Sequence, residues 1–332
     1  MKNKITITDI ANISQVSKAT VSYYINGRLD KMSDKTAKKI KEAIEKTNFK
    51  PSYAARSLNS KNSQLIGIII GNITNPFSNQ FVKGIEDYAN TQDYLTIVAS
   101  SEFKPDRERT YIESMLSMGV DGFLIQPTIE SSSYFKQKET NKPIVYFDSP
   151  STLNNERYVK TNNYEAVYDA TKILINKGYQ HFILISSNPY VLQTRIERNK
   201  GCTDALNDSN ISYDLIIIDD DIELLKQRLY PIINNRKNVC IFAFNNSLLQ
   251  LTYDALQPYI HRIPEIGLIG FDHEQWCECV RPTITTINQP AYQEGYTAGQ
   301  ILFDAIYNQN QVDKIQILNS TLVERESTNL KK

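Results

Sequence analysis

Histidine is scarce in this chain of 332 residues, and the motifs that accompany enzymatic sites are missing from its sequence. His181, His261 and His273 are isolated from one another, although histidine is the side chain most often used for general acid–base catalysis. No GxSxG, P-loop or HExxH pattern occurs. The sequence therefore argues against an enzyme, and we expect no catalytic residue and no cofactor.

Cysteine and long apolar runs are lacking as well. The four cysteines do not have the spacing of a disulfide framework, and Cys277-Glu278-Cys279 offers only two thiols on a helix-like segment where alternate residues diverge. No run of eighteen apolar residues could span a membrane, and the first ten residues, MKNKITITDI, lack the apolar core of a signal peptide. We therefore expect reduced thiols, no bound metal, no membrane contact and a cytoplasmic location.

The formal net charge of zero conceals two parts of opposite charge. Residues 1–61 hold thirteen Lys and Arg against five Asp and Glu, a net charge of +8, whereas residues 62–332 hold 24 against 32, a net charge of −8. A basic segment attached to an acidic body indicates that only the segment meets a polyanion such as DNA.

The basic segment has the pattern of a helix-turn-helix. Residues 6–9 form a capping box with Asp in the last position, a break follows at residues 14–15, and Ser17 caps a second helix that Asn26-Gly27 ends. Ser33 caps a third helix whose apolar face completes a small core. In the second helix Val21 and Ile25 lie on the core side, so its polar front suits the major groove of DNA.

Residues 51–63 connect this headpiece to the rest of the chain. The stretch from Pro51 to Leu58 favours a helix of two turns, which is too short to be stable alone in water. One interpretation is an ordinary linker. The other is a hinge that folds on DNA, with Leu58 as a wedge between base steps.

From residue 64 the pattern alternates between strands and helices. The expected strands are 65–70, 95–99, 122–126, 144–147, 181–185, 215–218, 239–244 and 266–271. The expected helices include 78–91, 107–118, 165–177, 198–207 and 247–259. Strands rich in Val and Ile that alternate with helices predict parallel, doubly wound sheets, and the number of units predicts two lobes with a ligand cleft between them.

The predicted fold is thus an all-α helix-turn-helix headpiece joined to an α/β core of two doubly wound lobes. The series of strands and helices pauses near residues 154–161, and a late helix (291–307) and strand (314–318) should return to the first lobe. The expected parts are a headpiece (1–50), a hinge (51–63), an N-terminal lobe (64–161 plus 291–320) and a C-terminal lobe (162–290 plus 321–332).

At this point the sequence resembles the LacI/GalR-type transcriptional regulators. The resemblance covers residues 6–11, 16–22, 55–58, 65–69, 73–77, 119–122, 269–272, 282–287 and 289–290, and thus almost the full length of the chain. It implies a repressor that binds a pseudo-palindromic operator and carries a small-molecule effector in a core similar to periplasmic sugar-binding proteins. The C-terminus lacks apolar heptads, so we expect a homodimer.

The resemblance implies roles in DNA binding. Lys18, Ala19 and Tyr23 match base-reading positions, and Leu58 matches the wedge in the minor groove, flanked by Arg56 and Asn59. The positions that match phosphate contacts are Ser17, Thr20, Ser22, Asn26 and Ser33. For Ser17 and Ser33, helix capping is an equally good interpretation.

The resemblance also implies an effector site. Its ligand-binding pattern falls on Asn75, Phe77, Asp148, Arg198, Asn245 and Asp272, and Phe77 or Trp276 could stack on a sugar face. Arg198 stands where the family holds an arginine that forks onto ligand hydroxyls or carboxylates. Alternatively, Asp148 only caps the helix that follows its strand.

Three positions depart from the family pattern in charge. Ser149 stands where Arg is common, and Asn162 and Asn246 stand where Asp is common. Fewer carboxylates in the cleft favour a sugar acid or a sugar phosphate over a neutral sugar, and some segments resemble the branch that regulates ketodeoxygluconate and hexuronate use. Two alternatives stay open: control by a partner protein, and a solute-binding protein, which the basic headpiece disfavours.

Overall fold

The structure is a computed structural model that describes residues 5–25, 27–49, 62–128, 131, 134, 140–149, 156–188, 192–272 and 275–330. It divides into two compact units, Met1–Gln64 and Leu65–Lys332. Within the described ranges, no helix is both long and apolar enough to cross a membrane. The predicted Asn26, Arg56, Leu58 and Asn59 lie outside the described residues.

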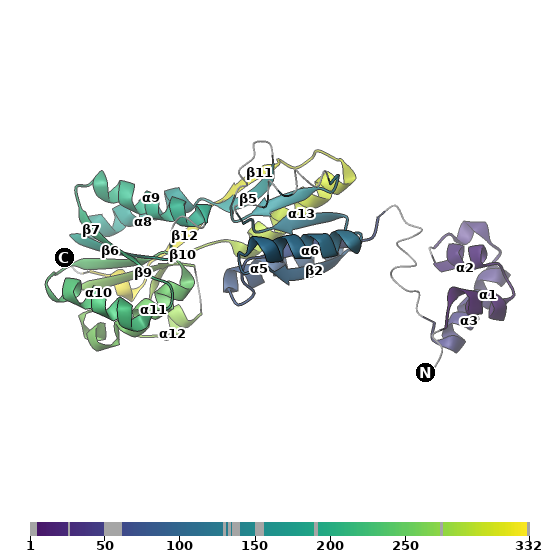
Figure 1. Ribbon diagram of the computed structural model, residues 1–332, viewed down its shortest axis with the longest axis horizontal. Coiled ribbons are helices and arrows are strands. Elements are labelled where there is room, and N and C mark those ends of the chain that lie inside the picture. The colour runs from purple at the N-terminus through teal and green to yellow at the C-terminus, as the bar shows by residue number, and fades with distance from the viewer. Residues whose placement is uncertain are drawn as a thin grey trace. The chain divides into compact units, whose positions relative to one another are not determined.

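The first unit is a bundle of three short helices, drawn in purple in Figure 1. Its elements are α1 (Ile7–Ser14), α2 (Lys18–Ile25), the 3₁₀ turn η1 (Leu29–Lys31) and α3 (Asp34–Thr47). The core consists of Ile10, Ala11, Val21, Ile40 and Ala43, all buried. The lysines of α3 at positions 35, 38, 39 and 41 lie on its exposed side, so the expected helix-turn-helix arrangement is confirmed.

The predicted caps set the helix boundaries of this unit. The Asp9 amide donates to Thr6 Oγ1 and the Thr6 amide to the Asp9 carboxylate, which is the expected capping box. The hydroxyl of Ser17 accepts from the Thr20 amide at 3.1 Å. Ser33 caps α3 in the same way, and Gly27 follows α2 with a φ of +72°, which favours glycine.

The first sheet of the second unit is entirely parallel. Its strand order is β11-β5-β4-β3-β1-β2. The strands are β1 (Leu65–Ile70), β2 (Leu95–Ser100), β3 (Gly122–Ile125), β4 (Ile144–Phe147), β5 (Arg157–Thr161) and β11 (Ile315–Leu318). Helices α5 (Pro76–Thr91) and α13 (Ala291–Tyr307) pack on one face, whereas α6 (Pro105–Ser117) packs on the other.

The second sheet has the order β12-β10-β9-β8-β6-β7, and only the β10–β12 pair is antiparallel. The strands are β6 (His181–Ser186), β7 (Ser212–Ile217), β8 (Val239–Ala243), β9 (Ile266–Phe271), β10 (Thr285–Asn288) and β12 (Thr321–Val323). In Figure 1, α8 (Asn163–Lys177) and α9 (Gln193–Asn207) cover one face of this sheet, and α10 (Ile222–Asn234) and α11 (Asn246–Ala255) cover the other.

Short elements complete this lobe: η3 (Gln257–Arg262), α12 (Trp276–Cys279) and η4 (Glu326–Thr328).

The chain passes between the two sheets three times, and we call the connecting segments the crossovers. The first joins β5 to α8 through Asn162, the second joins β10 to α13 through Gln289 and Pro290, and the third joins β11 to β12 through Asn319 and Ser320. The late helix and the strand β11 therefore lie with the first sheet.

One expectation about the strands was wrong. The sequence predicts a pause in the series at residues 154–161, but residues 157–161 form the strand β5, which pairs with β4 and β11. Only Val159 and Thr161 of this strand are buried. The partly exposed positions can therefore hold the charged Arg157 and Lys160, which interrupt the apolar pattern that would mark a strand. The short strands β10 and β12 were not predicted either.

Helices α5 and α13 approach each other so closely that a side chain at Gly295 has no room. A Cβ atom at this position would lie 2.0 Å from the Phe81 carbonyl oxygen, well inside contact distance. The backbones of the two helices touch here because glycine leaves the space empty.

The substitution Gly295→Ala should therefore destabilise the protein, although alanine has a higher intrinsic helix propensity than glycine by about 1 kcal/mol. We expect the free energy of unfolding to fall by about 1–3 kcal/mol because overpacking forces the helices apart. Denaturant unfolding of the full chain measures it, with the exposed Gln293→Ala on the same helix as the control. A stabilised Gly295→Ala protein would contradict the close contact.

Candidate effector pocket and DNA-reading helix

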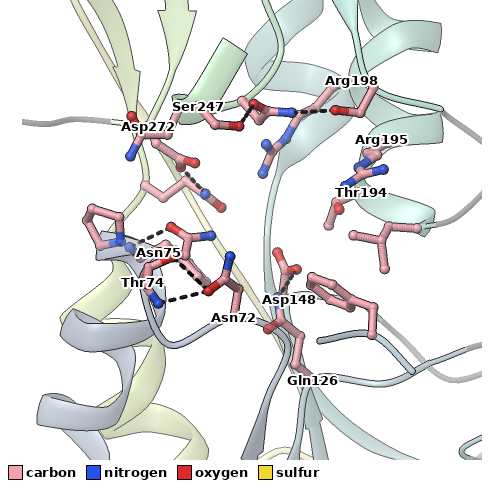
Figure 2. Close-up of a pocket in the computed structure, with 18 of the residues that line it drawn as sticks. Asn72, Thr74, Asn75, Gln126, Asp148, Thr194, Arg195, Arg198, Ser247 and Asp272 are labelled. Carbon is pink, nitrogen blue, oxygen red and sulfur yellow. Dashed lines mark hydrogen bonds between the residues drawn. The ribbon is translucent and has the colours of Figure 1, made fainter. Parts of the chain in front are cut away.

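A pocket of about 300 Å³ lies between the two lobes, where strands of both sheets end. Side chains of the first lobe, among them Asn72, Thr74, Asn75, Phe77, Gln126 and Asp148, line one side. Side chains of the second lobe, among them Thr194, Arg195, Arg198, Asn245, Asn246 and Asp272, line the other. Figure 2 shows Arg195 and Arg198 across the open space from Asn72 and Asn75, with the Asp148 carboxylate pointing into it.

The structure brings together six of the seven residues that were predicted for the effector site. These are Asn75, Phe77, Asp148, Arg198, Asn245 and Asp272. Trp276 lies outside this pocket, in a neighbouring cavity that shares Phe77, Asp272 and Gln289 with it. The Trp276 ring packs at 5.5 Å from that of Tyr253 and belongs to the edge of the second lobe's core.

Asp148 follows β4 in a left-handed turn with a φ of +65°. Its carboxylate accepts a hydrogen bond of 2.8 Å from Gln126 Nε2, and Gln126 Oε1 accepts one of 2.7 Å from the Gly71 amide. The amide of Gln126 thus fixes the carboxylate, which serves the pocket and caps no described helix. Burial raises the pKa of Asp148 above its usual range, although the charge of Arg198 and the Gln126 bond act in the opposite direction.

Asp272 occupies the equivalent place after β9, with a φ of +79°. Its carboxylate accepts a hydrogen bond from Gln289 Nε2, a side chain of the second crossover. Both pocket aspartates therefore stand at strand ends and are oriented by a glutamine amide.

Arg198 is the buried cation of the pocket, with 5% of its surface exposed. Its Nε donates to Asn163 Oδ1 at 2.8 Å and its Nη1 to the Phe244 carbonyl at 2.9 Å, and the guanidinium lies 3.7 Å above the Phe271 ring. All these partners are neutral, and Nη2 has no hydrogen bond to the residues that the structure describes. The positive charge is therefore held in place and remains available to a ligand.

Arg195 was missed in the sequence analysis although it lies one turn before Arg198 on the same face of α9. Its Nη1 donates to the Asn188 carbonyl at 3.2 Å. Burial lowers the pKa of its guanidinium, which indicates a partly desolvated charge. The i, i+3 spacing on the helix was the signal that could have identified it.

The structure corrects the sequence-based reasoning about charge in the cleft. Only Asn246 of the three departures lines the pocket. Asn162 lies in the first crossover, where its Oδ1 accepts from the amide and the hydroxyl of Ser320, and Ser149 is buried outside the pocket. The positive side of the pocket thus comes from Arg195 and Arg198 and not from a loss of three charged positions.

The second helix of the headpiece presents the predicted base-reading residues to solvent. Lys18, Ala19 and Tyr23 are exposed on α2, whereas Val21 is fully buried. The guanidinium of Arg28 lies 5.5 Å from the Tyr23 ring centre and extends this face with a positive charge. The hydroxyl of Ser17 binds Thr20, so capping accounts for at least part of its role.

The described residues contain no cluster of three or more His, Cys, Asp or Glu side chains that could hold a metal ion. Cys202, Cys240 and Cys277 are buried as free thiols and Cys279 is exposed.

Comparison with protein families assigns both units. Residues 6–52 match the model of bacterial regulatory proteins of the lacI family, and residues 66–310 match that of the periplasmic binding protein domain. The chain belongs to the LacI family. It is a DNA-binding transcriptional regulator whose core has the fold of periplasmic binding proteins.

Relatives named as regulators match over nearly the full length. The transcriptional regulator KdgR of Bacillus subtilis is 28% identical over 97% of both chains, and the repressor PurR of Aliivibrio fischeri is 28% identical over 97% of this chain and 98% of its own. Catabolite control protein A of Priestia megaterium is also 28% identical, over 98% and 99%. These relatives carry the names of regulators and not of enzymes.

Two solved structures illustrate the fold. A LacI-family regulator of Enterococcus faecium with bound ribose has a TM-score of 0.71 and 25% identity, over 81% of this chain and 100% of its own. The Lac repressor dimer bound to operator has a TM-score of 0.82 and 21% identity, over 98% and 99%.

The raised pKa of Asp148 predicts a pH dependence of stability. Because its folded pKa lies above the ordinary 3.8, its contribution to stability is present below that value and is lost as the pH rises through the raised pKa. The melting temperature of wild type should therefore fall relative to that of Asp148→Asn as the pH rises from 4 to 8. Thermal melting of both proteins measures the difference, and Asp313→Asn on the exposed surface should follow wild type.

Proposed function

We propose that this regulator is a repressor whose effector is an acidic sugar, either a sugar acid or a sugar phosphate, bound between the lobes. The observation that carries the proposal is the pair Arg195 and Arg198 on one wall of the pocket, with Arg198 bonded only to neutral groups. A buried guanidinium whose hydrogen bonds go to neutral acceptors suits an anionic ligand.

The other groups of the pocket suit a polyhydroxylated ring. Asn72, Asn75, Asn245 and Asn246 offer amides, and the carboxylates of Asp148 and Asp272 accept from hydroxyls. Phe77 provides an apolar surface for a ring face. The volume of about 300 Å³ lies at the lower end of small-molecule sites, which favours a single sugar ring.

Relatives with bound sugars support the proposed ligand class. The Enterococcus faecium regulator holds ribose, and a regulator of Alkaliphilus metalliredigens holds D-xylulofuranose at 29% identity and a TM-score of 0.69, over 80% of this chain and 98% of its own. The relatives KdgR and PurR are equally similar to this chain, so the pocket and not the degree of identity supports the acidic sugar.

On DNA, we propose a cytoplasmic, non-catalytic homodimer with two headpieces (1–50) in successive major grooves and two hinges (51–63) in the central minor groove. Lys18, Ala19 and Tyr23 read bases, and Ser17, Thr20, Ser22, Asn26 and Ser33 contact phosphates. Arg56, Leu58 and Asn59 act in the minor groove. The lobes 64–161 plus 291–320 and 162–290 plus 321–332 change their relative angle when the effector binds.

Calorimetric titration with matched pairs of neutral and acidic sugars tests the ligand class. We expect galacturonate or glucuronate to bind on the order of tenfold tighter than galactose or glucose, because a charge-assisted bond contributes about 1.5–3 kcal/mol. Arg198→Lys should lose most of this preference, since an ammonium cannot keep the fork. Arg228→Lys outside the pocket is the control.

Tight binding of neutral sugars alone would sink the acidic-sugar proposal. A gel shift that responds to no sugar would favour the alternative that a partner protein controls the regulator.

The substitution Leu58→Ala distinguishes the contribution of the proposed wedge to specific DNA binding from nonspecific attraction to DNA. We expect affinity for DNA selected from a random pool by wild type to fall on the order of tenfold, about 1.4 kcal/mol, while salt-dependent nonspecific binding is unchanged. Leu29→Ala, at a headpiece leucine that is 53% exposed, is the matched control. Fluorescence anisotropy at several salt concentrations measures both, and equal loss on both DNAs would show that Leu58 is no wedge.

A further inference from the structure

Glu294 is a fully buried carboxyl group that lies behind the effector pocket and does not line it. It belongs to the first turn of α13, directly after the second crossover, and its amide donates to the Pro290 carbonyl at 2.8 Å. No lysine or arginine donates a hydrogen bond to it within the described part of the chain. A buried acid that receives no hydrogen bond from a basic side chain is costly, so its position calls for an explanation.

The two oxygens of Glu294 join the pocket to the first crossover. Oε1 accepts from the backbone amide of Asp148 at 3.2 Å, and Oε2 accepts from the hydroxyl of Thr161 at 3.0 Å. The Asp148 amide also donates to the Val159 carbonyl at 3.0 Å, so the turn that carries the pocket carboxylate is tied both to β5 and to Glu294.

The third crossover is attached to the same network. Thr161 is followed by Asn162, whose amide donates to the Leu318 carbonyl at 3.0 Å. The Asn162 side-chain oxygen accepts from the Ser320 amide at 2.8 Å and from the Ser320 hydroxyl at 3.1 Å. Asn162 thus joins the first crossover to the third, and Glu294 ties Thr161, the residue before Asn162, to the start of α13 after the second crossover.

Glu294 is also a titratable group of this network, beside Asp148. Burial raises the pKa of Glu294 well above its ordinary range, and the nearby Asp148 carboxylate raises it further, whereas Thr161, the Asp148 amide and Arg198 lower it. Arg198 faces both carboxyl groups from α9, and Asp272 and Glu197 act on Asp148. A ligand charge placed against Asp148 and Arg198 is therefore felt by Glu294.

We propose that Glu294 is the positioning residue that couples an effector bound against Asp148 to the three crossovers between the lobes. The identity of the effector in this inference rests on the proposed function. The connection between the crossovers does not depend on it. Effector binding shifts the Asp148 turn, and Glu294 transmits this shift to Thr161 and to the start of α13. The angle between the lobes follows because the crossovers are the segments that join them.

Hydrogen exchange of the intact chain without effector tests the connection. In Glu294→Leu, exchange should accelerate several-fold or more in all three crossovers, although the first lies more than a hundred residues before the other two in sequence. Glu294→Gln should restore wild-type exchange, because the amide can accept from Asp148 N–H and donate to a rotated Thr161 hydroxyl. Acceleration confined to the first turns of α13 would overturn the proposal.

The matched control is Glu108, a second buried glutamate of the same lobe. It accepts from the Thr128 amide at 3.1 Å and from the hydroxyls of Thr128 and Ser131, but it contacts no crossover. Glu108→Leu should accelerate exchange near residue 128 only. If it loosens the crossovers as much as Glu294→Leu does, the effect is a general loss of stability and the proposal is wrong.

A second arm uses galacturonate as the probe. In wild type it should slow exchange at the pocket and at all three crossovers. The Kd of Glu294→Leu for galacturonate should lie within about threefold of the wild-type Kd, since Glu294 does not line the pocket. Galacturonate should then slow exchange at the pocket alone and no longer at the crossovers. If Glu294→Leu loses both galacturonate binding and the protection from exchange, Glu294 only supports the structure of the pocket, and the proposed coupling is wrong. A wild type whose exchange does not respond to galacturonate excludes galacturonate as the effector, while the effector-free arm still decides on Glu294.

Discussion

The alignment of parallel strands is the constraint on which the site depends. All strands of a parallel sheet end at the same edge, so the turns that follow them gather their polar residues in one place. Asp148 after β4 and Asp272 after β9 both adopt left-handed turns, a conformation that short polar side chains tolerate better than most. The same residues therefore end the strands and supply the carboxylates of the pocket, one from each lobe.

The cation of the pocket is held by a different principle. Arg198 rests on the ring of Phe271, and its hydrogen bonds go to an amide oxygen and a carbonyl oxygen. Neutral acceptors compensate for part of its lost hydration without neutralising its charge. A carboxylate in their place would have stabilised the empty pocket and weakened the binding of an anion.

Local signals made much of the structure predictable, and distant packing accounts for the rest. The caps at Thr6, Ser17 and Ser33 depend on neighbours three residues away, and the sequence displays these neighbours directly. Strand β5 was not predicted because it carries charged side chains whose partners lie outside the strand. Lys160 Nζ, for example, lies 2.6 Å from Glu197 Oε1. The place of Asn162 depends on Ser320, a residue 158 positions away, and no periodicity could reveal that contact.

The close helix contacts have a consequence for how this protein moves. At Gly295 a Cβ would lie 2.0 Å from the Phe81 carbonyl oxygen, and at Gly201 of the other lobe 2.4 Å from that of Tyr164. Backbones in such contact cannot slide past each other without a clash, so shear within a lobe is blocked. Any rotation of one lobe against the other must then come from backbone dihedral changes in the three short crossovers.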